Sequence, residues 1–521
     1  MISSGFLLAL ILIVGFIAGI FILDRFDLLE PFGLEMSGPL LMWKTKKGRD
    51  LIDRIAQKKR FWEIYGNIGL VVVGIAMVII FLMVAFNAYM ATAIPAEQAP
   101  DANEILVIPC VNPFIPVGYG ILSLAVGIIV HEFSHGILSR AADVDIKSLG
   151  LIFLVVPLGA FVEPDEDQIE ETERIKRDRM FAAGVTSNIV LAIILVLVFS
   201  TVFMGSVSAE EDGVMIRGVY EDTPAAEAEM QSYDQILEID GKEITGTKDL
   251  GSLNINLTET NEETLREVDV SVRKGKDYRT YKNVTVGLVV IGILEDSPAH
   301  DAGLEPGAIL YQINETTIHN RNDLSDALKG KDKISLKYWQ KNNSEDAEYK
   351  IEQENLTLED GLMGINMGYF GLTYEDADWL PKLLSNPLSA GKTGLQPLRF
   401  YFQNAATYIA LPLLGLSPVP EQLTGLYEIS GPLSALPTNG FWILANSIYW
   451  VFWLNILLGL FNALPAIPLD GGYLFQDGIE DLSERLGLNE DTGEKLSSGM
   501  TYALALLVLF LLMWSMIGPR I

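Results

Sequence analysis

The chain has 521 residues, and half of them are apolar, which indicates a protein that lies partly in lipid. Its net charge of −30, from 67 acidic and 37 basic residues, excludes a nucleic-acid-binding protein that works through a basic patch. Most of the acidic excess lies outside the apolar runs, where it favours exposed surfaces hydrated at high salt over mimicry of nucleic acid. The single Cys110 excludes internal disulfides and zinc sites made of thiolates.

The N-terminal part predicts two membrane spans. Residues 2–23 are apolar, without a basic start or an evident cleavage site, which indicates an uncleaved anchor and not a signal peptide. Residues 24–66 contain nine Lys and Arg, a second apolar run follows at about 67–93, and the loop 94–112 has no Lys or Arg. The positive-inside rule therefore places 24–66 in the cytoplasm and the N-terminus outside.

The third apolar run, at about 114–138, runs inward and carries the sequence V-H-E-F-S-H-G at 130–136 near its cytoplasmic end. Positions four apart share a helix face, so His131 and His135 can direct imidazole nitrogens to one point. H-E-x-x-H supplies two metal ligands, with Glu132 beside them as a general base. Two core histidines bonded to carbonyls are the alternative, but ionisable side chains are costly in an apolar span.

The third metal ligand has two possible sources. One zincin layout takes a Glu a few tens of residues downstream, which nominates Glu163 or Glu166. Asp470 is the other candidate, because it follows a second long apolar run and precedes two glycines that would let the backbone turn tightly. The residues alone leave both open.

Three blocks make the chain resemble the site-2 protease family of intramembrane zinc metalloproteases (M50 type). They are HEFSHG at 131–136, GLIFLVVPLGAFVEPDED at 150–167 and NALPAIPLDGG at 462–472. The resemblance covers about 1–206 and 361–521, and the remainder is an insertion. It implies one zinc ion per chain, held by His131, His135 and Asp470. It also makes Asn462 a candidate for binding the substrate backbone or the oxyanion, with capping of the broken helix before Pro465 as the alternative.

Residues 149–161 are apolar but too short to cross a membrane, and Pro157 and Gly159 interrupt them. They predict a re-entrant hairpin that dips towards the metal, with a simple interfacial loop as the alternative. The family resemblance implies a membrane-embedded β-hairpin here, which could pair with an extended substrate. A further span at about 184–206 returns the chain to the outside.

Residues 207–360 are polar, acidic and repeated. E-D-T-P-A at 221–225 recurs as E-D-S-P-A at 295–299, and I-L-E-I-D at 236–240 recurs as L-Y-Q-I-N at 310–314, both 74 residues later. The pattern resembles PDZ domains and predicts modules at 207–286 and 287–360. A-G-L-E-P-G at 302–307 is typical in the second copy, whereas the first copy lacks both glycines at 229–232.

The C-terminal part completes the predicted membrane domain. In the juxtamembrane part 361–439, residues 395–416 indicate an amphipathic segment at the outer surface, with a full span as the alternative. The span at about 440–464 runs inward and delivers Asn462 and Asp470 to the cytoplasmic depth of His131. An acidic inner loop at 476–496 and a final span at 498–517 follow.

We therefore expect a polytopic α-helical membrane protein with about six or seven spans and an inserted extracytoplasmic α+β region of tandem PDZ-like modules. Residues 1–112 form an N-terminal two-span segment, and 113–206 and 440–521 form the two catalytic halves. The expected function is regulated intramembrane proteolysis of single-span transmembrane substrates in the cell membrane. The PDZ-like modules would gate access or bind a peptide or protein ligand, and no nucleic acid is involved.

Two other classes of protein compete with the protease. One is a membrane scaffold or receptor with a structural metal, which would normally be closed by four protein ligands, whereas only three good ones are found. The other is a metal transporter, for which further carboxylates and histidines along the spans are missing.

Overall fold

The computed structural model describes residues 4–96, 99, 101–109, 111–154, 156–251, 265–341, 349–359, 361–385, 407–412 and 418–520. These residues divide into two compact units. A helical unit comprises 1–199, 405–418 and 443–521, and a sheet-rich unit comprises 200–404 and 419–442. Most of the predicted segment 395–416 lies outside the described residues, so the choice between a span and an amphipathic segment stays open.

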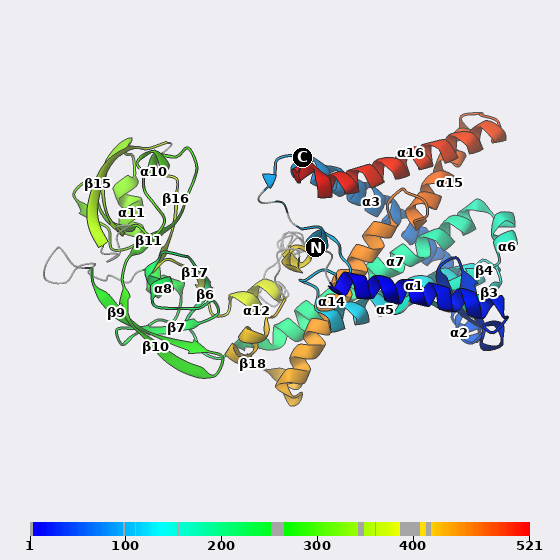
Figure 1. Cartoon of the computed structure of the whole chain (residues 1–521), viewed down its shortest axis with the longest axis horizontal. Coiled ribbons are helices and arrows are strands. Elements are labelled where there is room, and N and C mark those ends of the chain that lie inside the picture. The colour runs from blue at the N-terminus through cyan, green and yellow to red at the C-terminus, as the bar shows by residue number, and fades with distance from the viewer. Residues whose placement is uncertain are drawn as a thin grey trace. The chain divides into compact units, whose positions relative to one another are not determined.

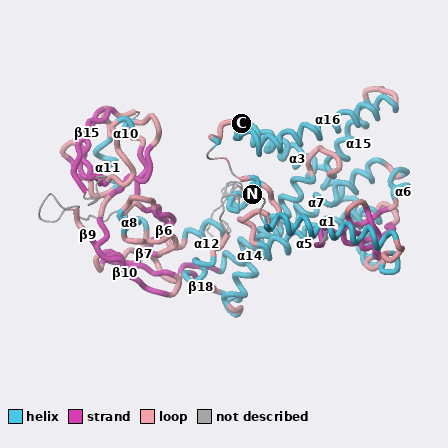
Figure 2. Tube along the Cα trace, in the orientation of Figure 1, coloured by secondary structure: helices cyan, strands magenta, loops and turns pink. Residues whose placement is uncertain are grey.

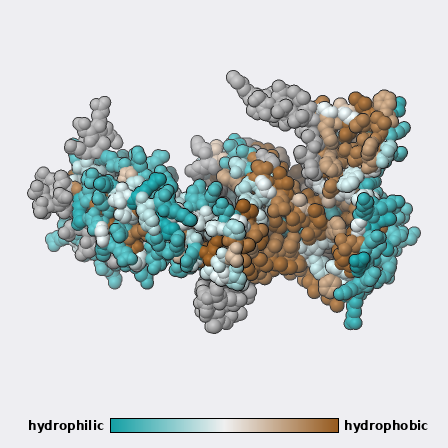
Figure 3. All heavy atoms as spheres, turned by 90° about the horizontal axis from the view of Figure 1, so that it is seen from below, coloured by the Kyte–Doolittle hydropathy of each residue, from teal (hydrophilic) through white to brown (hydrophobic). Residues whose placement is uncertain are grey.

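The helical unit is built from long apolar helices (Figure 1). Its helices are α1 Ser4–Arg25, α2 Arg49–Ala56, α3 Lys59–Ala91, α4 Ala102–Ile105, α5 Val117–Ala141, α6 Glu166–Glu171, α7 Arg174–Val198, α14 Thr438–Asn462, α15 Asp470–Arg485 and α16 Glu490–Ile517. Among the described residues, five helical segments are long and apolar enough to cross a membrane: Lys59–Ala91, Val117–Ala141, Arg174–Ser206, Thr438–Asn462 and Glu490–Arg520. Hydrophobic atoms cover much of this unit in Figure 3, as expected of a surface that faces lipid.

Small residues let the long helices approach one another. A Cβ on Gly69 of α3 would lie 2.6 Å from the Thr186 hydroxyl of α7, and a Cβ on Gly66 would meet the Arg179 side chain. Helices in lipid gain little from hydrophobic burial against each other, so close contact at small residues is what joins them. These contacts fix α3 against α7.

A four-stranded antiparallel sheet accompanies the helices, in the order β1-β2-β3-β4. Its strands are β1 Leu34–Ser37, β2 Leu40–Thr45, β3 Ile146–Leu154 and β4 Val156–Pro164. The predicted hairpin at 149–161 is thus present as β3 and β4, and the simple loop is wrong. The basic segment 24–66 contributes two strands that the sequence did not predict. β4 lies at the end of the sheet order and leaves one edge free of a strand partner among the described residues.

The expected acidic loop at 476–496 is largely helical. α15 runs to Arg485, and α16 begins at Glu490. Arg177 of α7 makes a two-pronged ion pair with Asp477 at 2.8 and 2.9 Å, and Arg174 binds Glu484 in the same manner. Neutralisation of these acids explains how so acidic a segment packs as a helix.

The strands of the sheet-rich unit, coloured magenta in Figure 2, form two modules with the same strand order. The first module consists of β6 Val214–Val219, α8 Pro224–Glu227, β7 Gln235–Ile239, β8 Lys242–Glu243, α9 Thr247–Gly251, β9 Glu267–Lys274, β10 Asp277–Thr285 and β17 Leu372–Asp376. The second module consists of β11 Leu288–Ile293, α10 Pro298–Asp301, β12 Ile309–Ile313, β13 Thr316–Thr317, α11 Arg321–Leu328, β14 Lys333–Lys341, β15 Tyr349–Thr357 and β16 Ile365–Tyr369. The unit also contains α12 Trp379–Leu384 and a pair of short strands, β5 Val207–Ala209 and β18 Tyr427–Ile429.

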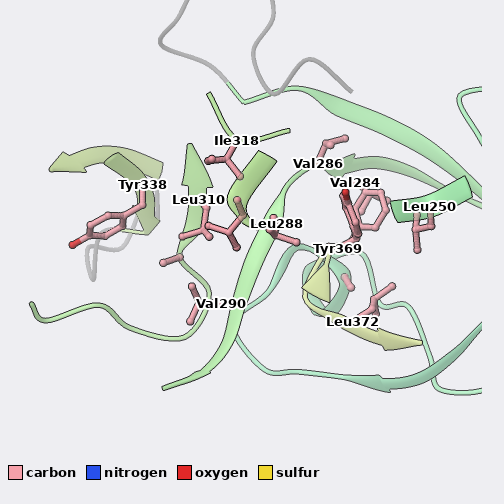
Figure 4. Close-up of a cluster of buried hydrophobic side chains, with 14 of the residues drawn as sticks. Leu250, Val284, Val286, Leu288, Val290, Leu310, Ile318, Tyr338, Tyr369 and Leu372 are labelled. Carbon is pink, nitrogen blue, oxygen red and sulfur yellow. The ribbon is translucent and has the colours of Figure 1, made fainter. Parts of the chain in front are cut away.

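The repeat in the sequence corresponds to this duplication. β6, α8, β7 and β8 each begin 74 residues before β11, α10, β12 and β13. Buried side chains of both modules form one hydrophobic cluster, which includes Leu288 and Tyr369 of the second module beside Leu372 of the first (Figure 4). These side chains carry the packing energy of both sheets.

The second module is nested inside the first. The first sheet has the order β10-β9-β7-β6-β17, so its last strand comes from beyond the whole second module. The second sheet, β15-β14-β12-β11-β16, is closed by β16 just before β17. The backbone N–H of Phe370 donates to the carbonyl of Gly287 at 3.0 Å, so the second module enters and leaves at neighbouring points.

Candidate metal centre

Two histidines of α5 and one aspartate of α15 converge in the helical unit. Nε2 of His131 lies 3.1 Å from Oδ2 of Asp470, and Nε2 of His135 lies 3.4 Å from the same oxygen. Their three ligand atoms all lie within 4.8 Å of one another. The side chains are 10%, 17% and 15% exposed for His131, His135 and Asp470. Among the described residues, these three form the group of His, Cys, Asp and Glu side chains that could hold a metal ion.

The alternative third ligands lie elsewhere. Glu163 on β4 accepts hydrogen bonds from the Ser148 hydroxyl and from Lys44. The Ser148 bond and the Lys44 charge lower the pKa of Glu163 below its usual value, although partial burial opposes them. Glu166 is exposed at the start of α6. Neither carboxylate belongs to the group of potential ligands.

Residues of α7 contact the imidazoles of both histidines. The carbonyl of Met180 lies 2.8 Å from Nδ1 of His135, so an Nδ1–H can donate to it and leave Nε2 with a free lone pair. A Cβ on Gly184 would lie 2.5 Å from both His131 Cε1 and His135 Nε2. Only glycine lets α7 approach the two imidazoles this closely.

Asp470 reaches the histidines from the first turn of α15. The two glycines after it were expected to make a tight turn, but both lie within the helix. Their role is close approach, because a Cβ on Gly472 would lie 2.5 Å from the carbonyl carbon of Ala466, and one on Gly471 would lie 2.6 Å from the carbonyl oxygen of Leu464. The ion pair between Arg177 and Asp477 then fastens the middle of α15 to α7.

Glu132 points to the sheet and is not part of the ligand group. Its Oε2 accepts a hydrogen bond of 3.3 Å from the backbone N–H of Val162 on β4. A Cβ on Gly136 would lie 3.0 Å from Cγ1 of Val162, so a glycine also allows β4 to pack against α5. This hydrogen bond holds Glu132 beside the histidines but outside the group of metal ligands.

Asn462 ends α14 and is partly exposed. Its side-chain Nδ2 donates to the carbonyl of Leu458 at 3.0 Å, one turn back in the same helix. This bond uses one of the two amide N–H donors, and the predicted contact of Asn462 with a substrate stays a prediction.

The three side chains fit a zinc ion. Oδ2 of Asp470 is buried and has no hydrogen-bond donor in suitable geometry, although both Nε2 atoms are near. Two nitrogens and one carboxylate oxygen directed to one point form a common ligand set of catalytic zinc sites, which keep the fourth position open. His131, His135 and Asp470 would hold the ion.

Comparison with known proteins identifies the family. The model of Peptidase family M50 matches residues 119–508, which include both parts of the candidate metal centre. The chain belongs to this family. It is a zinc metalloprotease with membrane-spanning helices, as its M50 relatives and its own helices indicate.

Named relatives of this M50 peptidase agree with the family. A candidate zinc metalloprotease of Neisseria meningitidis serogroup A is 23% identical over 448 residues, covering 75% of this chain and 96% of the relative. The Regulator of sigma E protease of Haemophilus influenzae is 22% identical over 418 residues, which cover 69% of this chain and 89% of the relative. An uncharacterised protein of Methanocaldococcus jannaschii is 27% identical over half of this chain and 67% of that protein.

Sequence reasoning missed the supporting residues of this M50 peptidase. Met180, Gly184 and Asn188 of α7 all contact the histidines, and Val162 contacts Glu132. Met180 acts through its backbone and therefore has no signature in the sequence. Residues 180, 184 and 188 are spaced four apart and therefore share one face of α7. This spacing was the sequence signal from which their common role could have been predicted.

Proposed function

We propose that this peptidase cleaves transmembrane protein substrates within the membrane, with a zinc ion held by His131, His135 and Asp470. The observation that supports this most directly is the convergence of three ligand atoms from two helices that lie more than 300 residues apart in sequence, with Glu132 beside them. A zinc ion in such a site supplies Lewis acidity, which activates water and polarises a carbonyl group.

Glu132 is the proposed general base and acid. Its carboxylate would take a proton from the attacking water and pass that proton to the leaving amine nitrogen. The hydrogen bond from Val162 N–H fixes the direction of this carboxylate before a substrate arrives. Such preorganisation lowers the cost of reaching the transition state.

The edge of β4 is the proposed site for the substrate backbone. A peptide must be extended to expose its scissile bond, and an extended peptide can add a strand to an open sheet edge. Val162 links that edge to Glu132, so a strand added there would lie beside the proposed base. Asn462 is the proposed partner of the substrate backbone or of the oxyanion.

The two modules of the sheet-rich unit would act as PDZ-like gates of substrate access. In this proposal the enzyme is a multi-pass protein of the cell membrane, with the N-terminus and the modules outside and the metal near the cytoplasmic face. The Haemophilus relative is named as a regulator, which supports a role in regulated proteolysis. Single-span proteins are the proposed substrates.

A trap variant tests this proposal. Glu132→Gln should abolish cleavage of a reconstituted substrate and leave one zinc ion per chain, because Glu132 lies outside the ligand group. Glu166→Gln is the matched control, since Glu166 is exposed on α6, and it should keep both zinc and activity. Loss of stoichiometric zinc in Glu132→Gln would contradict its role as the base.

A further inference from the structure

Asn188 is a fully buried asparagine in contact with a proposed metal ligand. Its amide nitrogen lies 3.2 Å from Nδ1 of His131. Its other polar atom, Oδ1, is buried without a hydrogen-bond partner. An orphaned carbonyl oxygen in the interior costs stability, and exchanging the two ends of the amide needs only a half-turn of the amide group.

The chemistry of His131 decides between the two orientations. If Nδ2 donated to Nδ1, then Nε2 of a neutral imidazole would carry the proton and could not hold a metal. If Oδ1 faces Nδ1, it accepts an Nδ1–H bond and leaves the lone pair on Nε2, which is the atom that faces Asp470. The exchange gives Oδ1 a donor and moves the amide nitrogen to the position that Oδ1 held.

We propose that Asn188 is a positioning residue whose Oδ1 accepts the hydrogen bond of His131 Nδ1–H and so keeps His131 in its metal-binding tautomer. The proposal rests on the proposed role of His131 as a zinc ligand. Asn188 is the counterpart of the Met180 carbonyl, which serves His135 in the same way. Such outer hydrogen bonds orient the imidazole and raise its basicity as a ligand.

The surroundings of Asn188 hold it in place. Met180, Gly184 and Asn188 are four residues apart, so they form one stripe of α7 against the histidines. Gly184 permits the close approach of this stripe. On the other side, a Cβ on Gly459 of α14 would lie 3.0 Å from Cγ1 of Ile189, the neighbour of Asn188, so a glycine allows α14 to pack closely there.

Zinc affinity tests the proposal without relying on catalysis. Dissociation constants of the full chain would be measured in detergent by competition with a chromophoric chelator, at one fixed pH. Asn188→Leu, which removes the acceptor at similar size, should weaken zinc binding about 10- to 100-fold. Asn188→Asp offers only acceptor oxygens and should keep an affinity close to that of the wild type. Asn446→Leu is the control, because Asn446 is also a buried asparagine but lies on α14, and this variant should leave the affinity unchanged.

Each outcome decides a different point. Unchanged affinity in Asn188→Leu, or equal weakening in Asn188→Asp and Asn188→Leu, would overturn the acceptor role of Asn188. His131→Ala separates this inference from the function on which it rests. If His131→Ala binds zinc as tightly as the wild type, the proposed ligand set fails. If it loses zinc while Asn188→Leu does not, only the inference about Asn188 fails.

Folding of the variants is checked by size-exclusion chromatography of the zinc-free proteins. If Asn188→Leu is not monodisperse, Asn188→Ala replaces it in the same comparison, because it adds no bulk between α5 and α7.

Discussion

Glycines beside the metal centre and glycines in a turn of the second sheet module are needed for different reasons. In the helical unit, Gly184 and Gly472 have ordinary helical backbone and are needed because neighbouring atoms occupy the place of a side chain. In the second sheet module, Gly303 and Gly307 adopt positive φ values of 74° and 92° in a turn. The first module builds the matching turn with Glu229 and Tyr233, at φ values of 58° and 72°.

The difference shows where each unit tolerates change. Positive φ in residues with a side chain costs about 1–2 kcal/mol, and a packed sheet can bear that cost. A side chain at Gly184 would instead collide with the two imidazoles that hold the proposed metal. We therefore expect the largest effects of substitution on zinc in the helical unit, and effects on substrate choice or stability in the sheet-rich unit.

The largest effect is expected at the third ligand. Asp470→Ala removes one of the three converging atoms and should abolish both stoichiometric zinc and proteolysis. Metal analysis of the purified protein measures this. Glu163→Ala and Glu166→Ala are the controls and should retain zinc; loss of the metal in Glu163→Ala alone would refute the assignment of Asp470.

The next effect is expected at the closest helical contact. Gly184→Ala should lower zinc affinity and activity by about 100-fold, because a Cβ would lie 2.5 Å from atoms of both imidazoles. Gly74→Ala in α3 is the matched control, since a Cβ there meets nothing within 4 Å. Equal affinities in the two variants, by the same competition assay, would show that α7 does not position the histidines.

Excision of the second module should change substrate choice and leave the metal unaffected. Deletion of 207–360 is unsuitable, because it would remove the strands with which β16 and β17 pair. Deletion of 288–369 is the better choice, because it joins Gly287 directly to Phe370, and these two residues already share a backbone hydrogen bond. We expect the shortened enzyme to keep zinc and to cleave substrates whose outer domains are intact, as a size filter requires.

Matched long and short substrates, cut by full-length and shortened enzyme in liposomes, measure this change. A recruiting role predicts slower cleavage of every substrate, because a peptide would bind the edge of a module. Uniformly reduced rates with zinc intact would therefore contradict the filter.

The smallest effect is expected in the turn of the first module. Glu229→Gly should raise local stability by up to about 1 kcal/mol, because glycine relieves the positive φ but loses more freedom on folding. Hydrogen exchange of the amides in each module measures this in the full chain. The reciprocal Gly303→Glu should have the opposite sign, and a gain of stability there would contradict this account.

The sequence predicted the features that depend on local spacing. H-E-x-x-H lies on a helix, residues 149–161 form a hairpin, and the 74-residue repeat corresponds to duplicated elements. Each of these patterns is contained within one short segment or in its repetition. Asp470 could be nominated because it stands at the end of an apolar run, although Glu163 remained possible on residues alone.

Features that depend on long-range packing could not be predicted. α15 appeared to be an acidic loop because its partners, Arg174 and Arg177, lie about 300 residues earlier. β1 and β2 lie in a basic segment that gave no sign of strands, and the pairing of β2 with β3 joins residues more than 100 positions apart. β17 was missed for the same reason, since its partner β6 lies on the far side of the second module.

The nested arrangement of the modules also sets an order of assembly during synthesis. The first module lacks its last strand until β17 leaves the ribosome, after every strand of the second module has been made. The second module, whose strands are contiguous in the chain, can fold while the first is still incomplete. During translocation the edge of β6 would thus stay unpaired until the whole second module has crossed the membrane. β17 would then pair with β6 and complete the first sheet last.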